Sequence, residues 1–539
     1  MAMLCLSPNA YAYDFEIDGI YYEVLSVPET TVQVVASPQK YKGSISLPST
    51  ANWNGRSWTV TQIGSWAFSD CPELSEIVIP PSIAKIGMGA FTYTPIKRVH
   101  IADISAWMKV DLSNLAYYKS TSPFYNHANL VIDGKIVTEL AIPSGIKVIN
   151  GNLSGCGSLK TVILPPDCLQ MTYSGTYYGA TFANCINLET IIIEGENVVV
   201  CDHAFDGCIR LNDVSFLNKC RSIGEYAFAG CSSLTQVVIP DNIEQIGSYP
   251  FSGCENLESL TIGGGVAELP KEGSGYESYL NLLGGCKNLK ILEIADGEGA
   301  LDIFQSKNYS TGGSSYDLYR YYGSLHNNSL DSVKINREIY FWTPLEHLHY
   351  TCVYAPLAGN TSLKKAFIGG SMKELSPYFF HGCSSLESVS IGSEITRIGK
   401  DCFSGCNAIK QIVLYCTTPP KFSQSTKDLF SHTQLMSIEI IVPQGTLEVY
   451  KNSDGWKEFL NIKEGTSSGI NNIVEDNNSF SVTVIGGVLH ILNKDAKSIV
   501  RVFSTQGSLL VETMENEVNN LATGIYIVTI GNKSFKIKI

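Results

Sequence analysis

Cysteine is the residue type whose number and spacing first suggest chemistry in this chain of 539 residues. An exported protein with 16 cysteines would normally form disulfides. Nine of them instead share one position in a recurring pattern, three residues before a leucine or isoleucine: Cys71, Cys156, Cys185, Cys208, Cys231, Cys254, Cys286, Cys383 and Cys406. Equivalent side chains on stacked repeats point in one direction, so we predict small buried hydrophobic groups with a weak S–H donor. No C-x-x-C pair is present, which argues against a zinc ribbon or a thioredoxin-type redox motif.

Two histidines, His347 and His349, are spaced as a pair of metal ligands would be. In an extended segment, residues i and i+2 project to the same side, which suits two imidazole ligands. Cys352 follows three residues later, but no further ligand has a fixed spacing. We therefore favour an ordinary solvated turn over a metal site, and we predict neither a metal nor a cofactor.

Carboxylates could cleave a polysaccharide only if they were held at a fixed separation on one face of the protein. Acidic residues of inserted segments leave this alternative open: Glu272, Glu277, Asp296 and Glu298. Glu293 and Lys334 occupy outward positions of successive repeats, and we predict that they pair with each other. No nucleophile elbow, phosphate loop or H-E-x-x-H motif occurs. We predict no catalytic residue, and a carbohydrate-active enzyme is the alternative.

Aromatic residues give the clearest indication of binding, because they gather in segments inserted between repeats. Loops on a rigid scaffold commonly carry binding residues, and tyrosine offers a large contact area at low entropic cost. The candidate ligand-binding residues are Tyr177, Tyr178, Tyr276, Tyr279, Tyr309, Tyr316, Tyr319, Tyr321, Tyr322 and Trp342. Stacking on sugar rings and packing into a protein groove would both use such residues. Packing of the tyrosines among themselves, which would only close the loops, is the competing interpretation.

The elements that position these segments are repeats, most regularly of 23 residues. An aromatic returns at that interval in the clearest run: Phe182, Phe205, Phe228 and Phe251. The following L-x-x-V-x-I stretch, such as Leu234 to Ile239, alternates inward and outward side chains, as one short strand requires. Stacked units would form a parallel sheet and bury their apolar faces against their neighbours. We predict a solenoid of about 15 parallel rungs over residues 42–464, with Phe216 among the residues that end a strand.

The full pattern, I-x-x-I-G-x-x-A-F-x-x-C-x-x-L-x-x-I-x-I-P, resembles the BspA-like leucine-rich repeat family of host-associated bacteria. Residues 129–135 are similar to the family's inserted hairpin with an Asp-Gly turn, and residues 417–459 to its closing segment. One unit departs from the pattern, because Thr94 replaces the cysteine. The resemblance implies a secreted or surface protein of a bacterium that binds a protein or glycan of the host or of a neighbouring cell. It implies no shared ligand and no shared catalytic residue.

The N-terminal end of the chain has the composition of an export signal followed by a cap. Ala10-Tyr11-Ala12 fits the small-x-small rule for signal cleavage, so residues 1–12 are expected to be the remnant of a signal peptide. Lipid attachment at Cys5 is the disfavoured alternative. Residues 13–41 should form an N-terminal β cap, with a hairpin centred on Asp18-Gly19 that covers the first rung.

The C-terminal end departs from the repeat. Residues 465–478 have the composition of a linker, and residues 479–539 alternate as strands do, which predicts a small antiparallel β-sandwich. The stretch from Leu521 to Val528, with the basic residues near the end of the chain, resembles the C-terminal sorting domains of type IX secretion. That resemblance implies a module that export machinery recognises, whether it is later removed or retained as an anchor.

Composition restricts the partners of the protein. The net charge is −13, from 38 basic and 51 acidic residues, and no stretch supplies the basic stripe that nucleic acid requires. No apolar run approaches the length of a transmembrane helix. We therefore predict a binding protein that is secreted or displayed on the outer surface of a bacterium and catalyses no reaction. A purely structural component of the cell envelope is a further alternative.

Overall fold

The computed structural model describes residues 13–112, 119–171, 181–267, 286–302, 329–340 and 355–465. It also describes residues 481–485, 488–492, 500–504, 509–513, 517–518, 521, 525–530 and 533–538. The chain forms two compact units. One, the solenoid part, comprises residues 1–441 and 448–462, and the other, the C-terminal part, comprises residues 442–447 and 463–539.

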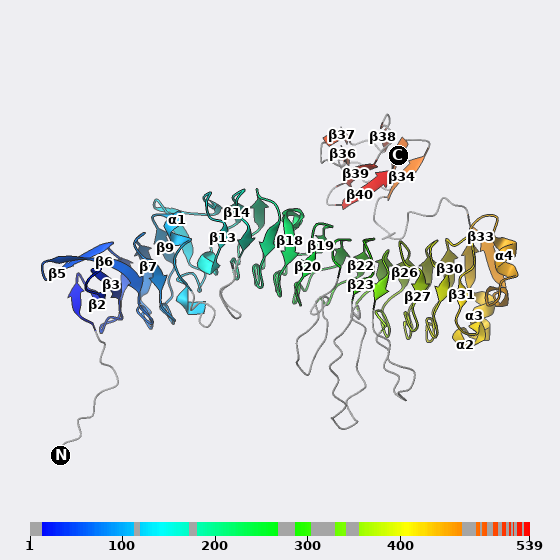
Figure 1. Cartoon of the computed structure of the whole chain (residues 1–539), viewed down its shortest axis with the longest axis horizontal. Coiled ribbons are helices and arrows are strands. Elements are labelled where there is room, and N and C mark those ends of the chain that lie inside the picture. The colour runs from blue at the N-terminus through cyan, green and yellow to red at the C-terminus, as the bar shows by residue number, and fades with distance from the viewer. Residues whose placement is uncertain are drawn as a thin grey trace, which may run out of the picture. The chain divides into compact units, whose positions relative to one another are not determined.

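The solenoid part is built from short parallel strands, one for each repeat. Its longest run of parallel pairs joins β19 (Gln236–Ile239), β21 (Ser259–Ile262), β22 (Ile291–Ile294), β24 (Ser332–Ile335), β26 (Lys365–Ile368), β28 (Ser388–Ile391), β30 (Gln411–Leu414) and β32 (Glu439–Val442), and β33 (Asn461–Glu464) is the next strand of that sheet. Within the solenoid part these strands follow one another along the long axis of Figure 1. Each inward residue is buried, as Val237 and Ile239 of β19 show. The predicted parallel repeat fold is thus present.

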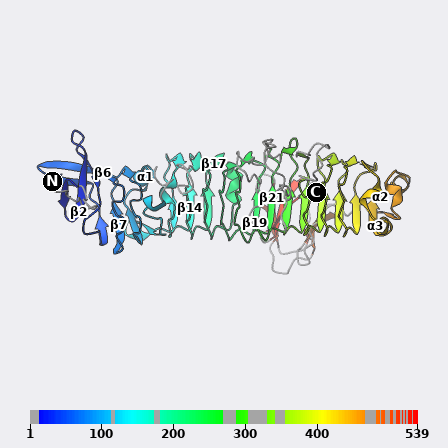
Figure 2. The same cartoon turned by 90° about the horizontal axis from the view of Figure 1, so that it is seen from below.

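Two further parallel sheets carry the same arrangement towards the N-terminus. One contains β4 (Gly43–Ser46), β7 (Leu74–Ile79), β9 (Arg98–Ile101) and β10 (Asn129–Ile132), and the other contains β12 (Glu139–Ala141), β14 (Thr161–Leu164) and β16 (Thr190–Ile193). The side-by-side strands of the solenoid part are visible from below in Figure 2. β11 (Lys135–Ile136) pairs antiparallel with β10, and Asp133 and Gly134 between them have positive φ. The predicted hairpin with an Asp-Gly turn is therefore confirmed.

Shorter strands form the second side of the repeats. They are β8 (Lys85–Ile86), β13 (Val148–Ile149), β15 (Gln170–Met171), β17 (Val198–Val200), β18 (Cys220–Ile223), β20 (Gln245–Ile246), β23 (Leu301–Asp302), β25 (Ile339–Tyr340), β27 (Glu374–Leu375), β29 (Arg397–Ile398) and β31 (Lys421–Phe422). The helical pieces are short: α1 (Ile104–Trp107), α2 (Thr426–Leu429), α3 (His432–Ser437) and α4 (Leu447–Lys451), with the 3₁₀ turns η2 (Lys119–Thr121), η3 (Gly151–Leu153), η4 (Ser215–Lys219) and η5 (Trp456–Glu458).

The strand predicted to end at Phe216 is wrong, because η4 occupies that place between β16 and β19. The Asp213 carboxylate accepts hydrogen bonds from the Ser215 backbone N–H and hydroxyl, both at 2.8 Å, and this local turn competes with an extended strand. Phe216 is nevertheless buried, and its ring lies 5.4 Å from Phe205 and 6.2 Å from Phe228 between centroids. The residue keeps its place in the core while the backbone leaves the sheet.

The N-terminal strands form a sheet in the order β1 (Phe15–Ile17), β2 (Ile20–Ser26), β3 (Thr31–Val34), β6 (Arg56–Ile63) and β5 (Thr50–Trp53). β1 and β2 pair antiparallel around Asp18 and Gly19, as the hairpin prediction required. Whether this hairpin serves as a cap stays a prediction. In the C-terminal part, β34 (Ser481–Ile485), β35 (Val488–Leu492) and β38 (Glu517–Val518) form one antiparallel sheet, and β37 (Leu509–Thr513), β36 (Val500–Ser504), β39 (Ile525–Ile530) and β40 (Lys533–Lys538) form another.

Candidate binding surface

The inserted aromatics predicted to bind a ligand lie outside the described residues, so their role stays a prediction. This applies to Tyr177, Tyr178, Tyr276, Tyr279, Tyr309, Tyr316, Tyr319, Tyr321, Tyr322 and Trp342, and equally to His347, His349, Glu272 and Glu277. Asp296 and Glu298 are described and exposed. Asp296 accepts a hydrogen bond from the Gly297 N–H at 3.0 Å, and the Glu298 carbonyl accepts one from Arg337 at 2.6 Å. These contacts hold a turn together.

The core of the rungs from Phe182 to Phe251 is a column of stacked phenylalanine rings. Centroid distances between successive rungs are 5.7 Å for Phe182 and Phe205, 5.3 Å for Phe205 and Phe228, and 5.6 Å for Phe228 and Phe251. The planes lie within 17° of parallel, and all four side chains are fully buried. The predicted core role of these rings is confirmed.

The repeat cysteines form a second column, in which seven of the nine thiols donate to a carbonyl of the rung before, whereas Cys71 and Cys156 bond within their own rung. Cys208 Sγ donates to the Phe182 carbonyl at 3.1 Å, Cys231 to Phe205 at 3.2 Å, and Cys254 to Phe228 at 3.2 Å. Burial raises the pKa of the Cys254 thiol to about 12, and it raises the pKa of the Cys208 and Cys231 thiols well above the ordinary value. All 14 cysteines within the described residues are free. The nine repeat cysteines are buried structural groups, as predicted.

Thr94, the departure from the cysteine pattern, performs the same task with a hydroxyl. Its side chain is fully buried and donates to the Phe68 carbonyl, one rung earlier. It also accepts a hydrogen bond from the Cys71 N–H at 3.1 Å. The position therefore requires a small side chain with a donor, and sulfur is one of two solutions.

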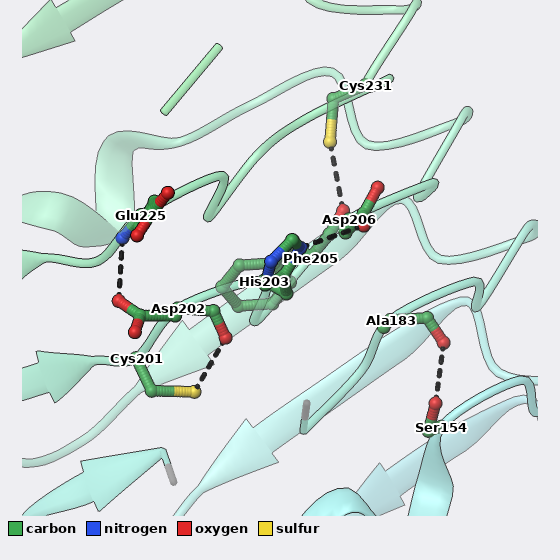
Figure 3. A network of polar contacts seen from close by, with 9 residues as sticks. All are labelled: Ser154, Ala183, Cys201, Asp202, His203, Phe205, Asp206, Glu225 and Cys231. Carbon is green, nitrogen blue, oxygen red and sulfur yellow. Dashed lines mark hydrogen bonds and ion pairs between the residues drawn. The ribbon is translucent and has the colours of Figure 1, made fainter. Parts of the chain in front are cut away.

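A cysteine, a histidine and an aspartate lie near one another at Cys201, His203 and Asp206 (Figure 3). His203 Nδ1 lies 3.0 Å from an Asp206 carboxylate oxygen. The Cys201 thiol donates to the Asp202 carbonyl at 3.3 Å, and burial raises its pKa to about 12. A nucleophilic cysteine requires a thiolate, so this thiol is not an activated nucleophile. Among the described residues, no group of three or more potential ligands could hold a metal ion.

The outward positions of the parallel strands form an open face that changes character along the solenoid part. Ile163 and Ile192 pair across β14 and β16, and the exposed fraction is 45 % for Ile192 and 50 % for Val238. Further along, Lys334 Nζ lies 2.6 Å from Glu293 Oε1, which confirms the predicted pair. An apolar stretch is thus followed by a neutralised ion pair. Exposed aliphatic side chains at outward strand positions suit contact with a protein surface better than with a charged ligand.

Arg337 is a buried cation that sequence reasoning missed. Its side chain is 1 % exposed, and it donates to the carbonyls of Gly299 at 2.8 Å, Gly264 at 3.0 Å, Val266 at 2.5 Å and Glu298 at 2.6 Å. Burial lowers the pKa of the guanidinium. One side chain therefore joins three rungs at the roots of two insertions, residues 268–285 and 303–328. An arginine two residues after the strand-ending Ile335 was the available signal.

Comparison with known proteins supplies the family. The model of the BspA-type leucine-rich repeat region, described as six copies, matches residues 56–174, 175–273 and 357–453, more than half of the 539 residues. The chain belongs to the BspA-type leucine-rich repeat family. No curated protein matches the sequence. No helix among the described residues is long and apolar enough to span a membrane.

Solved structures similar to this BspA-type chain come from bacteria. A leucine-rich repeat protein from Bacteroides ovatus has 18 % identity and a TM-score of 0.41, and the match covers 84 % of this chain and 100 % of that one. A leucine-rich cell surface protein from Faecalibacterium prausnitzii has 17 % identity and a TM-score of 0.31, with 78 % and 97 % covered. The pneumococcal vaccine antigen PcpA has 16 % identity and a TM-score of 0.26, with 84 % and 98 % covered.

These BspA-type repeats also carry a second ring column, which sequence reasoning missed. It lies two residues before the core phenylalanine, where His203 stacks on Tyr226 at 5.1 Å and Tyr226 on Tyr249 at 5.2 Å. Each of these residues has a positive φ. The recurrence of rings at this fixed offset in the sequence could have revealed the column. Since the rings cover one another's faces, we interpret the column as structural.

Proposed function

We propose that the protein is a secreted or surface-displayed scaffold that binds a protein or glycoprotein of the host or of a neighbouring cell and catalyses no reaction. The single observation that supports this most strongly is the open sheet face, where Ile192 and Val238 are about half exposed. Core polar groups such as the thiols of Cys231 and Cys254 are bonded to the preceding repeat, so neighbouring repeats support one another and can present side chains. The family of the chain is consistent with a protein-binding role.

Two regions compete as the contact surface, and they can be separated by mutation. One is the set of inserted tyrosines and the other is the open sheet face. The full chain would be tested against immobilised matrix glycoproteins, with a variant carrying Tyr316, Tyr319 and Tyr321 as alanine and a matched variant carrying I192S and V238S. Loss of binding in one folded variant identifies its region. Failure of the unmodified chain to bind any glycoprotein would contradict the proposal, and turnover of a polysaccharide would favour the enzymatic alternative.

The C-terminal part is proposed as a sorting or anchoring module that export machinery recognises. Its antiparallel strands β36 and β39 carry the buried residues Val500, Val502 and Val528, so it has a small core of its own. Deletion of residues 479–539 would leave the protein inside the cell if the module directs export. Unchanged amounts of truncated protein outside the cell would contradict this role.

A further inference from the structure

Tyr93 is held in a backbone conformation that bulky residues avoid. Its φ is 55°, in the left-handed region, where the Cβ atom lies too close to the following carbonyl oxygen. Such outliers persist where the surrounding structure imposes them, and they concentrate at functional sites. The position therefore needs an explanation in terms of what the tyrosine does.

Other rungs show which residues this position ordinarily takes. It lies two residues after the buried core residue of the repeat, and its described occupants with positive φ include Asp70, Asn184, Gly207, Gly230, Gly253, Gly359, Gly382 and Gly405. Glycine, asparagine and aspartate are the residues that adopt this conformation most readily. Tyrosine at the same place departs from the glycine, asparagine and aspartate that these rungs carry.

Packing explains the other large aromatics that have positive φ, but not Tyr93. The Trp66 ring lies against Gly89, where an added Cβ would come within 2.5 Å of it, and Tyr226 is stacked between His203 and Tyr249. The Tyr378 ring packs against His381 at 5.7 Å. The Tyr93 side chain is 77 % exposed and has no hydrogen bond or ring contact with any residue that the structure describes. Among the residues that the structure describes, no side-chain contact of Tyr93 offsets its strain.

We propose that Tyr93 is an anchor that inserts into a ring-sized apolar pocket on a partner protein; the proposal rests on the binding function proposed above. Tyrosine is enriched among the residues that dominate protein interfaces, and an apolar ring with a polar tip suits that role. Pro95 is exposed two residues after Tyr93, and Thr92 to Ile96 carry no charge. A ring that protrudes can act as an anchor only if its partner offers a pocket, and a folded protein offers one more readily than a glycan chain does, so a protein is favoured over a glycan.

The first test measures the strain in the full chain by urea unfolding. Y93N introduces the residue that Asn184 provides at the equivalent position, and it should raise the unfolding midpoint because no internal contact is lost. The matched control, Y226N, should lower the midpoint because it breaks a ring stack. A midpoint that falls in Y93N as far as in Y226N would show that the ring has a structural partner, and would overturn the proposal.

The second test measures binding to a panel of purified mammalian matrix glycoproteins, to the same proteins after deglycosylation, and to their released glycans. Y93N should weaken binding at least tenfold, Y93F should keep it within about threefold, and deglycosylation should leave it intact. Binding equal in Y93N and the unmodified chain would overturn the anchor while leaving the proposed function standing. Binding that follows the released glycans would overturn the choice of a protein partner. No binding to any glycoprotein would remove both proposals.

Discussion

Two regions of the solenoid part hold neighbouring rungs together in different ways. We call residues 181–262 the regular rungs and residues 286–340 the interrupted rungs. The regular rungs keep a constant repeat, so the phenylalanine column and the thiols align with the previous rung. The interrupted rungs carry insertions, and Arg337 instead joins its own rung to the two rungs before it through four backbone carbonyls. Uniform spacing allows neighbours to stabilise one another through identical side chains, whereas irregular spacing requires one long side chain that reaches several turns.

A second device crosses the interrupted rungs without depending on loop length. Charges alternate in sign at equivalent positions before successive strands: Glu258, Lys290, Asp331, Lys364, Glu387 and Lys410. Ion pairs join Lys290 to Glu258 at 3.0 Å, Lys364 to Asp331 at 2.8 Å, and Lys410 to Glu387 at 3.1 Å. If one rung were skipped in the stacking, side chains of like charge would become neighbours. The alternation of charge therefore favours the correct order of rungs.

The largest expected effect comes from breaking the ring column of the regular rungs. F228A removes a fully buried ring that stacks on Phe205 and Phe251, and it should lower the free energy of unfolding by about 3–5 kcal/mol. Urea unfolding followed by circular dichroism measures this change. F367A, on the outward side of β26, is the control and should cost less. Equal losses in the two variants would contradict the central role of the column.

Replacing Arg337 should have the next largest effect. R337M leaves four carbonyls without their charged donor, and we expect a loss of about 3 kcal/mol in the free energy of unfolding. The control is R397M, whose exposed guanidinium pairs with Glu374 at 2.6 Å and should contribute less than about 1 kcal/mol. An R337M protein as stable as the control would show that the interrupted rungs do not need the cation.

Alkaline pH should weaken the regular rungs through their thiols. The pKa of Cys254 is raised from 9.0 in the unfolded chain to about 12 in the fold, so its contribution is complete below pH 9 and is lost as pH rises towards 12. At pH 10 one such thiol lowers stability by about 1.4 kcal/mol. C254V should reduce the slope of the unfolding midpoint against pH between 9 and 10.5. A slope that does not change would contradict thiol ionisation as the cause.

The smallest effect is expected from the alternating charges. K364E places a carboxylate between Asp331 and Glu387, whereas K364A only removes the ion pair with Asp331. The side chains of Lys364 and Asp331 are both exposed. The difference between the two variants should stay below about 1 kcal/mol and should vanish in 1 M salt, where the Debye length is about 3 Å. Unfolding at low and high salt measures it. A difference that survives high salt would indicate lost packing instead of charge.

Much of the fold could be predicted because the sequence pattern is local and periodic. Phe182 to Phe251 recur every 23 residues, so each ring meets its equivalent on the next rung, and the buried cysteines follow from the same argument. Phe216 shows the limit. Its apolar pattern predicted a strand, but the Asp213 carboxylate bends the backbone into η4 while the ring stays in the core. Hydrophobic pattern specifies which side chains are buried more reliably than which backbone conformation buries them.

The candidate site divides in the same way. Sequence reasoning placed binding on inserted tyrosines such as Tyr316, which lie outside the described residues, and it passed over Tyr93. A tyrosine at that position looks ordinary in the sequence. Only the fold shows that its φ is positive, that its equivalents are glycine, asparagine or aspartate, and that its ring has no described partner.

The sequence by itself determined the repeat, its core columns and the family, because in a solenoid equivalent residues on adjacent rungs become neighbours in space. The tertiary structure decided what breaks the period: the turn at η4, the carbonyls that Arg337 reaches and the exposure of Tyr93. These features depend on where particular backbone groups come together across rungs of unequal length. The repeat period cannot predict such contacts, because it describes only the residues that the rungs have in common.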